Sequence, residues 1–245
     1  MVVNLMLIIF DVDGTLIGGE SHDWHCFDRA IEAVVGFAPT QEFFDSLPEI
    51  TAQAIAEASV RAADKEPGTG LEERICDEYL RRLRDVHFRE PDAFRPREGV
   101  IELLTHLRSL ADVGVAIATG DWQATISFKL AAAGIDVSPF PIATCSDHPR
   151  RADIIRLAVE RAGKSVAESI YVGDGVWDLR ACRELGMRFI GTGSRLDLLK
   201  KAGAEHTFTV LGQDLIRHFR SQEISVDLHD KERKAAVRNA ASAHL

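Results

Sequence analysis

The sequence predicts an α/β protein with a Rossmann-like parallel sheet core and a helical insertion after the first strand. Three observations lead to this prediction. Residues 5–10 are all apolar and end abruptly at Asp11, which is typical of a strand buried on both faces. Residues 18–94 have apolar residues at helical spacing and no strand pattern. From Pro96 onward, short apolar strands alternate with helices.

The composition is that of a globular protein large enough to bury a substantial core. The chain has 245 residues, of which 46% are hydrophobic and 27% charged, and its formal net charge is -9. This charge argues against nucleic acid or an anionic membrane as a partner, because no basic stripe offsets it. The four cysteines lack C-x-x-C spacing, so we expect free thiols in a reducing compartment. The apolar start lacks the basic n-region of a signal peptide, and we therefore expect a cytoplasmic protein.

The insertion is predicted to begin at Gly18 and Gly19, which permit unusual backbone angles and could form a hinge. The first helix would end at Gly36, with Asp23 as its N-cap. A short element follows between two prolines, and helical spacing continues over residues 50–64 and 71–86. Residues 22–25 lie where the entering chain could face a crevice. The insertion as a whole is assigned to residues 18–94.

The rest of the chain predicts alternating helices and strands. Helices are expected at 100–110, 126–133, 152–162 and 178–185, strands at 113–118, 140–144, 169–172 and 187–190, and short elements at 196–202, 206–210 and 215–219. This alternation implies right-handed crossovers within one parallel sheet, to which the first strand also belongs. The expected core is therefore residues 1–17 and 95–225, with a C-terminal tail at 226–245 to which no chemistry is assigned.

Three of the predicted strands are followed at once by polar residues. These residues are Asp11, Asp13, Thr119, Gly120, Asp174 and Asp178. Open parallel sheets bind ligands at the carboxyl ends of their strands. If these strands are neighbours, the six residues would therefore meet in one crevice. Clustered acids repel one another unless a hard cation such as Mg²⁺ lies among them. Taken alone, residues 11–16 fit an ordinary Asp-Gly turn equally well.

These segments resemble the motifs of the haloacid dehalogenase-like superfamily. Residues 11–16 (DVDGTL) resemble its first motif, D-x-D-G-T-L. Residues 119–120 resemble the second motif, a Thr or Ser after a strand, and residues 173–178 (GDGVWD) resemble the fourth, G-D-x-x-x-D. The resemblance covers roughly residues 5–219, with the insertion in the position of a type-1 cap. The overall pattern is most similar to the phosphoglycolate phosphatase-like branch.

The resemblance implies a Mg²⁺-dependent phosphatase that acts on a small phosphorylated metabolite. Asp11 would attack phosphorus and carry an aspartyl-phosphate, while Asp13 would protonate the leaving oxygen and then activate water. The implied metal ligands are Asp11, Asp13 through its backbone carbonyl, Asp174 and Asp178. The implied phosphate-binding residues are Gly14, Thr15, Thr119, Gly120 and Arg151.

The third motif departs from the family pattern, which has a Lys ahead of the unit that carries the fourth motif. The corresponding stretch here is residues 146–155 (SDHPRRADII), which contains no Lys. Arg151 aligns with that Lys and Arg150 is the alternate, although an Arg is not a simple Lys replacement. A solvated charge at a helix start is the structural alternative for this position.

Two other functions remain open. A β-phosphoglucomutase-like phosphomutase would share Asp11 and Asp13 but return the phosphoryl group to its sugar. A non-catalytic ligand-binding protein would keep the fold without turnover. Within the superfamily, Asp13 favours phosphate-ester chemistry, because dehalogenases and phosphonatases lack an acid at that position. We expect a small-molecule partner, no nucleic acid or membrane, and a monomer or homodimer.

Overall fold

The structure is a computed structural model that describes residues 6–219. Within this range the strands are β1 (Met6–Phe10), β2 (Val113–Ala118), β3 (Ile142–Ala143), β4 (Ser169–Gly173), β5 (Arg188–Gly191) and β6 (His206–Thr207). The α-helices are α1 (Glu20–Val35), α2 (Gln41–Ser46), α3 (Ala52–Ala62), α4 (Leu71–Arg89), α5 (Val100–Ser109), α6 (Gln123–Ala132), α7 (Arg151–Arg161), α8 (Val176–Leu185) and α9 (Leu196–Lys201). A 3-10 helix spans Val166–Glu168, and residues 213–219 are helical.

The six strands form one parallel sheet in the order β3-β2-β1-β4-β5-β6, so the predicted fold class is confirmed. β1 lies at the centre, between β2 and β4. Its last residue, Phe10, pairs with Ile117 on one side and with Val172 on the other. The three strands that precede the polar segments are thus adjacent and end at the same level. This is the point where the strand order reverses, which is where such sheets bind ligands.

Helices cover both faces of the sheet, which explains why β1 is apolar throughout. Leu7 and Ile9 pack in the same hydrophobic cluster as residues of α7, α8 and α9. Ile8 and Phe10 point to the opposite face, where the cluster includes residues of α5, α6 and the helical segment 213–219. Within residues 6–219, no helix is both long and apolar enough to cross a bilayer.

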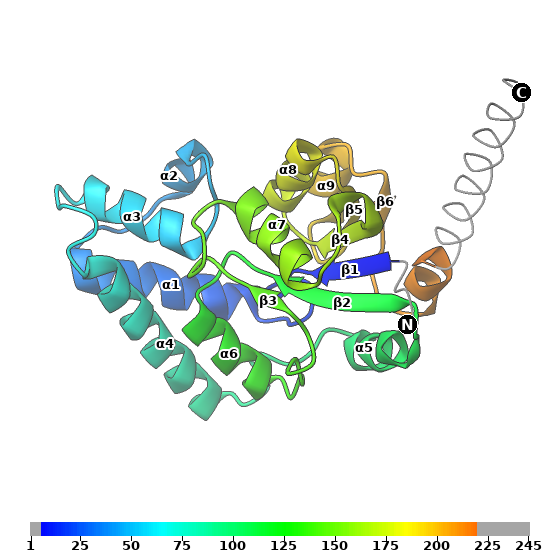
Figure 1. The fold of residues 1–245 in the computed structure, drawn as a ribbon. Coiled ribbons are helices and arrows are strands. Elements are labelled where there is room, and N and C mark those ends of the chain that lie inside the picture. Colours follow the sequence, from blue (N-terminus) through cyan, green and yellow to red (C-terminus); the bar gives the residue numbers. More distant parts are fainter. Residues whose placement is uncertain (1–5, 220–245) are drawn as a thin grey trace, which may run out of the picture.

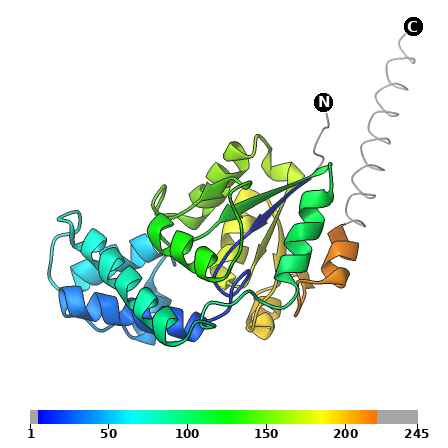
Figure 2. The same cartoon turned by 90° about the horizontal axis from the view of Figure 1, so that it is seen from below.

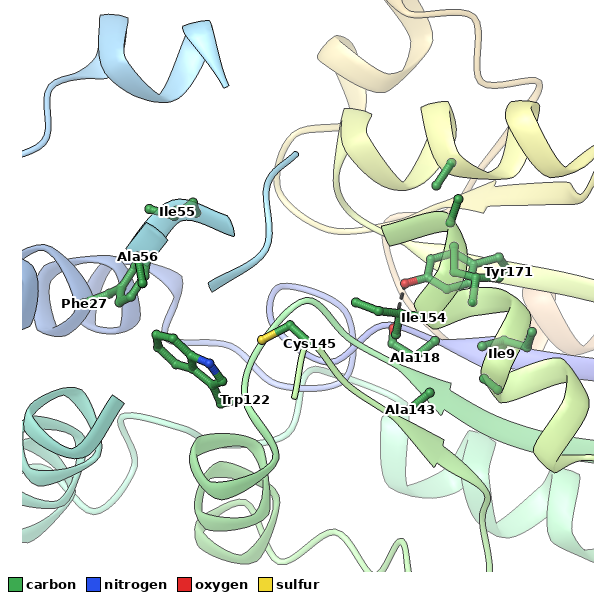
Figure 3. Packing of buried hydrophobic residues seen from close by; sticks show 14 of the residues in the cluster. Ile9, Phe27, Ile55, Ala56, Ala118, Trp122, Ala143, Cys145, Ile154 and Tyr171 are labelled. Carbon is green, nitrogen blue, oxygen red and sulfur yellow. Dashed lines mark hydrogen bonds between the residues drawn. The ribbon is translucent and has the colours of Figure 1, made fainter. Parts of the chain in front are cut away.

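Residues 18–94 contain the four helices α1 to α4 and no strand, as the sequence predicts. α1 packs along α4, α3 packs on both, and α4 also contacts α6 of the sheet layer. These helices lie beyond the carboxyl ends of the strands (Figures 1 and 2). Figure 3 shows Phe27 and Ala56 from this group near Trp122 from the loop after β2. The ring centroids of Phe27 and Trp122 are 5.7 Å apart.

Two local predictions are corrected by the structure. Asp23 is not an N-cap, because the helix begins at Glu20 after Gly19, and the Asp23 amide already donates to the Gly19 carbonyl. The expected strand at 140–144 is reduced to Ile142–Ala143, since Pro141 cannot donate a ladder hydrogen bond. Gly36 ends α1 as predicted. The tail at 226–245 lies outside the described residues.

Candidate active site

The loop after β1 turns tightly and leaves Asp11 buried at the edge of the sheet. The Asp11 amide donates to the Val172 carbonyl (2.9 Å), which continues the pairing of β1 with β4 by one residue. Gly14 then adopts φ +75°, and a Cβ there would lie 2.7 Å from Cγ of Asp174. Only glycine therefore suits this position, because it tolerates the left-handed conformation and leaves room for the carboxylate.

Three predicted carboxylates meet beside this loop. One oxygen each of Asp11, Asp174 and Asp178 lies within 4.8 Å of the other two, and all three side chains are buried. Asp174 accepts from Arg195 at 3.0 Å. Asp178 accepts from the Gly175 amide, also at 3.0 Å. The first and fourth motifs therefore open onto one crevice.

Burial and mutual repulsion disfavour the charged forms of these carboxyls. Burial, followed by the charge of Asp178, raises the pKa of Asp11 well above its ordinary value, although Arg151 opposes the shift. The same two causes raise the pKa of Asp174 to about 6. Burial also raises the pKa of Asp178. Such a set of crowded carboxylate oxygens fits a hard divalent cation such as Mg²⁺, which would stabilise the ionised forms.

The two arginines of the predicted third motif point in different directions. Arg151, the first residue of α7, is buried, and its Nη1 lies 3.4 Å from oxygens of both Asp11 and Asp178. Arg150 is exposed and pairs with surface acids, among them Glu184 at 2.8 Å. The structure thus brings Arg151, and not Arg150, into the acidic cluster.

Thr119 and Gly120 follow β2 and are both buried. The Thr119 amide donates to the Ala143 carbonyl (3.1 Å), which keeps this loop level with the end of β3. A Cβ on Gly120 would collide with the guanidinium of Arg151. The missing side chain therefore makes room for the cation, and both loop residues border the same pocket as Asp11.

The sequence prediction missed Lys129, although it lies at the centre of a buried charge cluster. Its fully buried ammonium lies 2.7 Å from Asp13, 2.8 Å from Asp23 and 2.7 Å from Asp121. The Tyr79 hydroxyl of α4 donates to Asp23 and lies 3.3 Å from Lys129 Nζ. A sequence signal existed, because position 129 falls on the apolar stripe that α6 buries.

Lys129 provides one positive charge for three carboxylates. Burial raises the pKa of Asp13 to about 8, with Asp23 and Asp121 adding to the shift and Lys129 opposing it. The neighbouring carboxylates hold the pKa of Lys129 itself above its ordinary value despite its burial. The Asp13 side chain therefore faces this second cluster rather than the cluster of Asp11, Asp174 and Asp178.

One pocket joins these groups to the helices of residues 18–94. From the sheet side it is lined by Asp11, Asp13, Thr119, Gly120, Asp121, Arg151, Asp174, Trp177 and Arg195. From the helical side it is lined by Glu20, Asp23, Trp24, Phe27, Ile50, Thr51, Ala52, Ile55 and Tyr79. The predicted residues Gly14, Thr15 and Asp178 lie behind this lining. The buried Thr15 hydroxyl has no hydrogen-bond partner among the described residues.

Residues 8–192 match the family described as haloacid dehalogenase-like hydrolase. The chain belongs to this family. The predicted superfamily and the predicted enzyme class, a hydrolase, are therefore confirmed.

Named relatives of this haloacid dehalogenase-like hydrolase agree with the family match. A phosphoglycolate phosphatase from Agrobacterium fabrum is 31% identical over 191 residues, which cover 76% of this chain and 79% of the relative. A hydrolase from Pseudomonas syringae has the same fold, with a TM-score of 0.70 and 22% identity over 88% of this chain and 98% of that one. CbbY from Rhodobacter sphaeroides, solved in complex with phosphate, has a TM-score of 0.67 and 20% identity over 85% and 96% of the two chains.

Proposed function

We propose that this haloacid dehalogenase-like hydrolase is a Mg²⁺-dependent phosphatase that cleaves small phosphorylated metabolites through an aspartyl-phosphate on Asp11. The observation that carries the proposal is the placement of the Asp11 carboxylate between two further carboxylates and one guanidinium. An anionic nucleophile reaches an anionic phosphate only where the charge between them is neutralised. The relative called a phosphoglycolate phosphatase supports the same reaction class.

In the first step, an Asp11 oxygen would form a bond to phosphorus while the bond from phosphorus to the ester oxygen breaks. Asp13 would give its proton to that leaving oxygen, and its raised pKa favours the protonated form at neutral pH. Thr119, the Gly120 amide and Arg151 would hold the phosphoryl oxygens. Mg²⁺, held by Asp11, the Asp13 carbonyl, Asp174 and, directly or through water, Asp178, would neutralise the charge between nucleophile and phosphate.

In the second step, a water molecule would attack phosphorus and break the bond to the Asp11 oxygen, releasing inorganic phosphate. Asp13, now ionised, would take the proton of this water and return to its starting form. A phosphomutase would instead return the phosphoryl group to its substrate. Release of free phosphate therefore separates the two reactions.

We further propose that the helices of residues 18–94 act as a cap over the site. They supply half of the residues that line the pocket. They also contact the catalytic loops directly, since the Ala52 amide donates to the Gly120 carbonyl (2.7 Å) and Arg151 donates to the Ile50 carbonyl (3.0 Å). A cap that closes in this way excludes water and large substrates.

The proposal is tested by phosphate release from an aryl phosphate such as para-nitrophenyl phosphate. Asp11→Asn should abolish release, because the amide cannot act as the nucleophile, and EDTA should do the same to the wild type. Asp214→Asn is the matched control, since Asp214 is an exposed residue that pairs with Arg217 and does not line the pocket. Wild-type activity in a folded Asp11→Asn protein would refute the assigned nucleophile.

A further inference from the structure

On the helical side, the pocket surface that would contact the leaving group of the substrate is mainly apolar and aromatic. Trp24, Phe27, Ile50 and Ile55 all line it, and the ring of Phe27 packs against those of Tyr79 and Trp122. This surface lies next to the proposed proton donor, because Asp13 and Asp23 of α1 both bind the ammonium of Lys129. The part of a substrate beyond its ester oxygen would therefore contact these side chains.

The ionisable side chains that border the pocket are predominantly acidic. Its lining includes six acidic residues but two arginines, and neither Lys nor His occurs among the described residues that form it. On the helical side, the charged residues are Glu20, which lies 3.7 Å from Arg97, and Asp23, which is paired with Lys129. A bound Mg²⁺ leaves this imbalance in place, since the phosphoryl group brings a comparable negative charge.

Each of the cations near the pocket is already engaged with acidic groups. Arg151 lies 3.4 Å from both Asp11 and Asp178. Arg195 donates to Asp174, and its guanidinium lies 4.9 Å from the ring centroid of Trp177. Lys129 is fully buried among three carboxylates, so it does not reach the pocket. A negatively charged leaving group would find no described cation that is not already paired.

We propose that this pocket selects phosphate esters whose leaving group is uncharged or cationic and has an apolar part, and that it disfavours leaving groups that carry a carboxylate. The inference rests on the proposed phosphatase function and narrows its substrate class. It sets this chain apart from a phosphatase of phosphoglycolate, whose leaving group, glycolate, carries a carboxylate. The physical basis is the excess of acids over cations in the lining, Glu20 among them, and the lack there of a described cation without an acidic partner. A partly desolvated site strengthens the resulting repulsion.

The experiment compares phosphate esters that differ mainly in the charge and the apolar character of the leaving group at the end away from phosphorus. They are 2-phosphoglycolate, ethyl phosphate, O-phosphoethanolamine and benzyl phosphate. We expect kcat/KM for ethyl phosphate and O-phosphoethanolamine to exceed that for 2-phosphoglycolate by about tenfold or more, because one unfavourable contact between like charges is of that order. Benzyl phosphate should be the best of the four, since its ring can pack on Trp24 and Phe27. A kcat/KM for 2-phosphoglycolate equal to or above that for ethyl phosphate overturns the inference.

A variant pair tests the electrostatic origin of the preference. Glu20→Gln removes one negative charge of the lining and should narrow the ratio between ethyl phosphate and 2-phosphoglycolate by roughly threefold or more. Glu102→Gln makes the same change in the first turn of α5, at an exposed residue outside the pocket lining, and should leave the ratio unchanged. An equal ratio in Glu20→Gln and Glu102→Gln would overturn the proposed origin.

The outcome also separates this inference from the proposed function. If the wild type with Mg²⁺ releases no phosphate from any of the four esters or from para-nitrophenyl phosphate, the phosphatase assignment fails. If phosphate is released and 2-phosphoglycolate is preferred, the phosphatase assignment stands and the leaving-group inference fails.

Discussion

Lys129 shows how strongly one buried residue can connect separate parts of the chain. Its ammonium binds Asp13 from the loop after β1, Asp121 from the loop after β2, and Asp23 from α1. A buried ion pair stabilises the fold only while both partners are present. If one partner is removed, the other becomes an uncompensated buried charge. The position of the proposed acid and base therefore depends on a residue outside the family's motifs.

Lys129→Met should destabilise the protein by about 3–5 kcal/mol, because the buried Asp121 and the partly buried Asp13 and Asp23 lose their cation. It should also lower the rate of phosphate release, since Asp13 is no longer held in place. Urea unfolding at pH 7 measures the first effect. Lys200→Met is the control, at an exposed position in the last turn of α9, and should change stability by no more than about 0.5 kcal/mol. A loss below about 1 kcal/mol in Lys129→Met would contradict the role assigned to this cation.

Among the structural elements, the turn after β1 illustrates why a loop can be as constrained as a strand. Gly14 and Gly36 have almost the same backbone angle, φ +75° and +76°. A Cβ at Gly36 would have no neighbour within 4 Å, whereas one at Gly14 would overlap the Asp174 carboxylate. The two positions therefore separate the cost of the left-handed conformation from the cost of displacing a proposed metal ligand.

Gly36→Ala should cost about 1 kcal/mol of stability through backbone strain alone, with phosphate release unchanged. Gly14→Ala carries the same strain and also displaces Asp174, so phosphate release should fall by about tenfold or more and require more Mg²⁺. Unfolding curves and a Mg²⁺ titration of activity distinguish the two variants. A Gly14→Ala protein with the wild-type Mg²⁺ dependence would show that the Asp174 carboxylate is not critically placed.

The sheet and the four inserted helices could be predicted because the spacing of apolar residues and the positions of turn residues indicate each element from its own stretch of sequence. β2 matches the predicted strand at 113–118 residue for residue. The clustering of the first and fourth motifs also followed, since neighbouring parallel strands end at one edge. Lys129 and the stacking of Arg195 on Trp177 did not follow, because each depends on contacts between distant elements. Residues 22–25 are expected to face the crevice, and Asp23 and Trp24 do line it.

For the whole molecule, the acids of the site should make stability depend on pH and, through the proposed Mg²⁺, on metal. The pKa of Asp174 is raised to about 6 and that of Asp13 to about 8, both well above the value near 3.9 of an unfolded chain. Without metal, the folded state therefore holds protons that the unfolded state has lost between about pH 4 and 8. The stability contributed by these two groups is present below pH 4 and is lost as the pH rises through 6 and 8.

Added Mg²⁺ should therefore raise the melting temperature more at pH 8 than at pH 5.5, because at the higher pH it replaces protons that the site no longer holds. The measurement compares EDTA-treated protein with and without Mg²⁺ at each pH, with KCl at matched ionic strength as the control for screening. Asp174→Asn removes one carboxyl with a raised pKa, which is also a proposed metal ligand. The change of stability with pH near pH 6 and the rise in melting temperature with Mg²⁺ should therefore both become smaller. A Mg²⁺ shift as large at pH 5.5 as at pH 8 would mean that the ion binds elsewhere than among these acids.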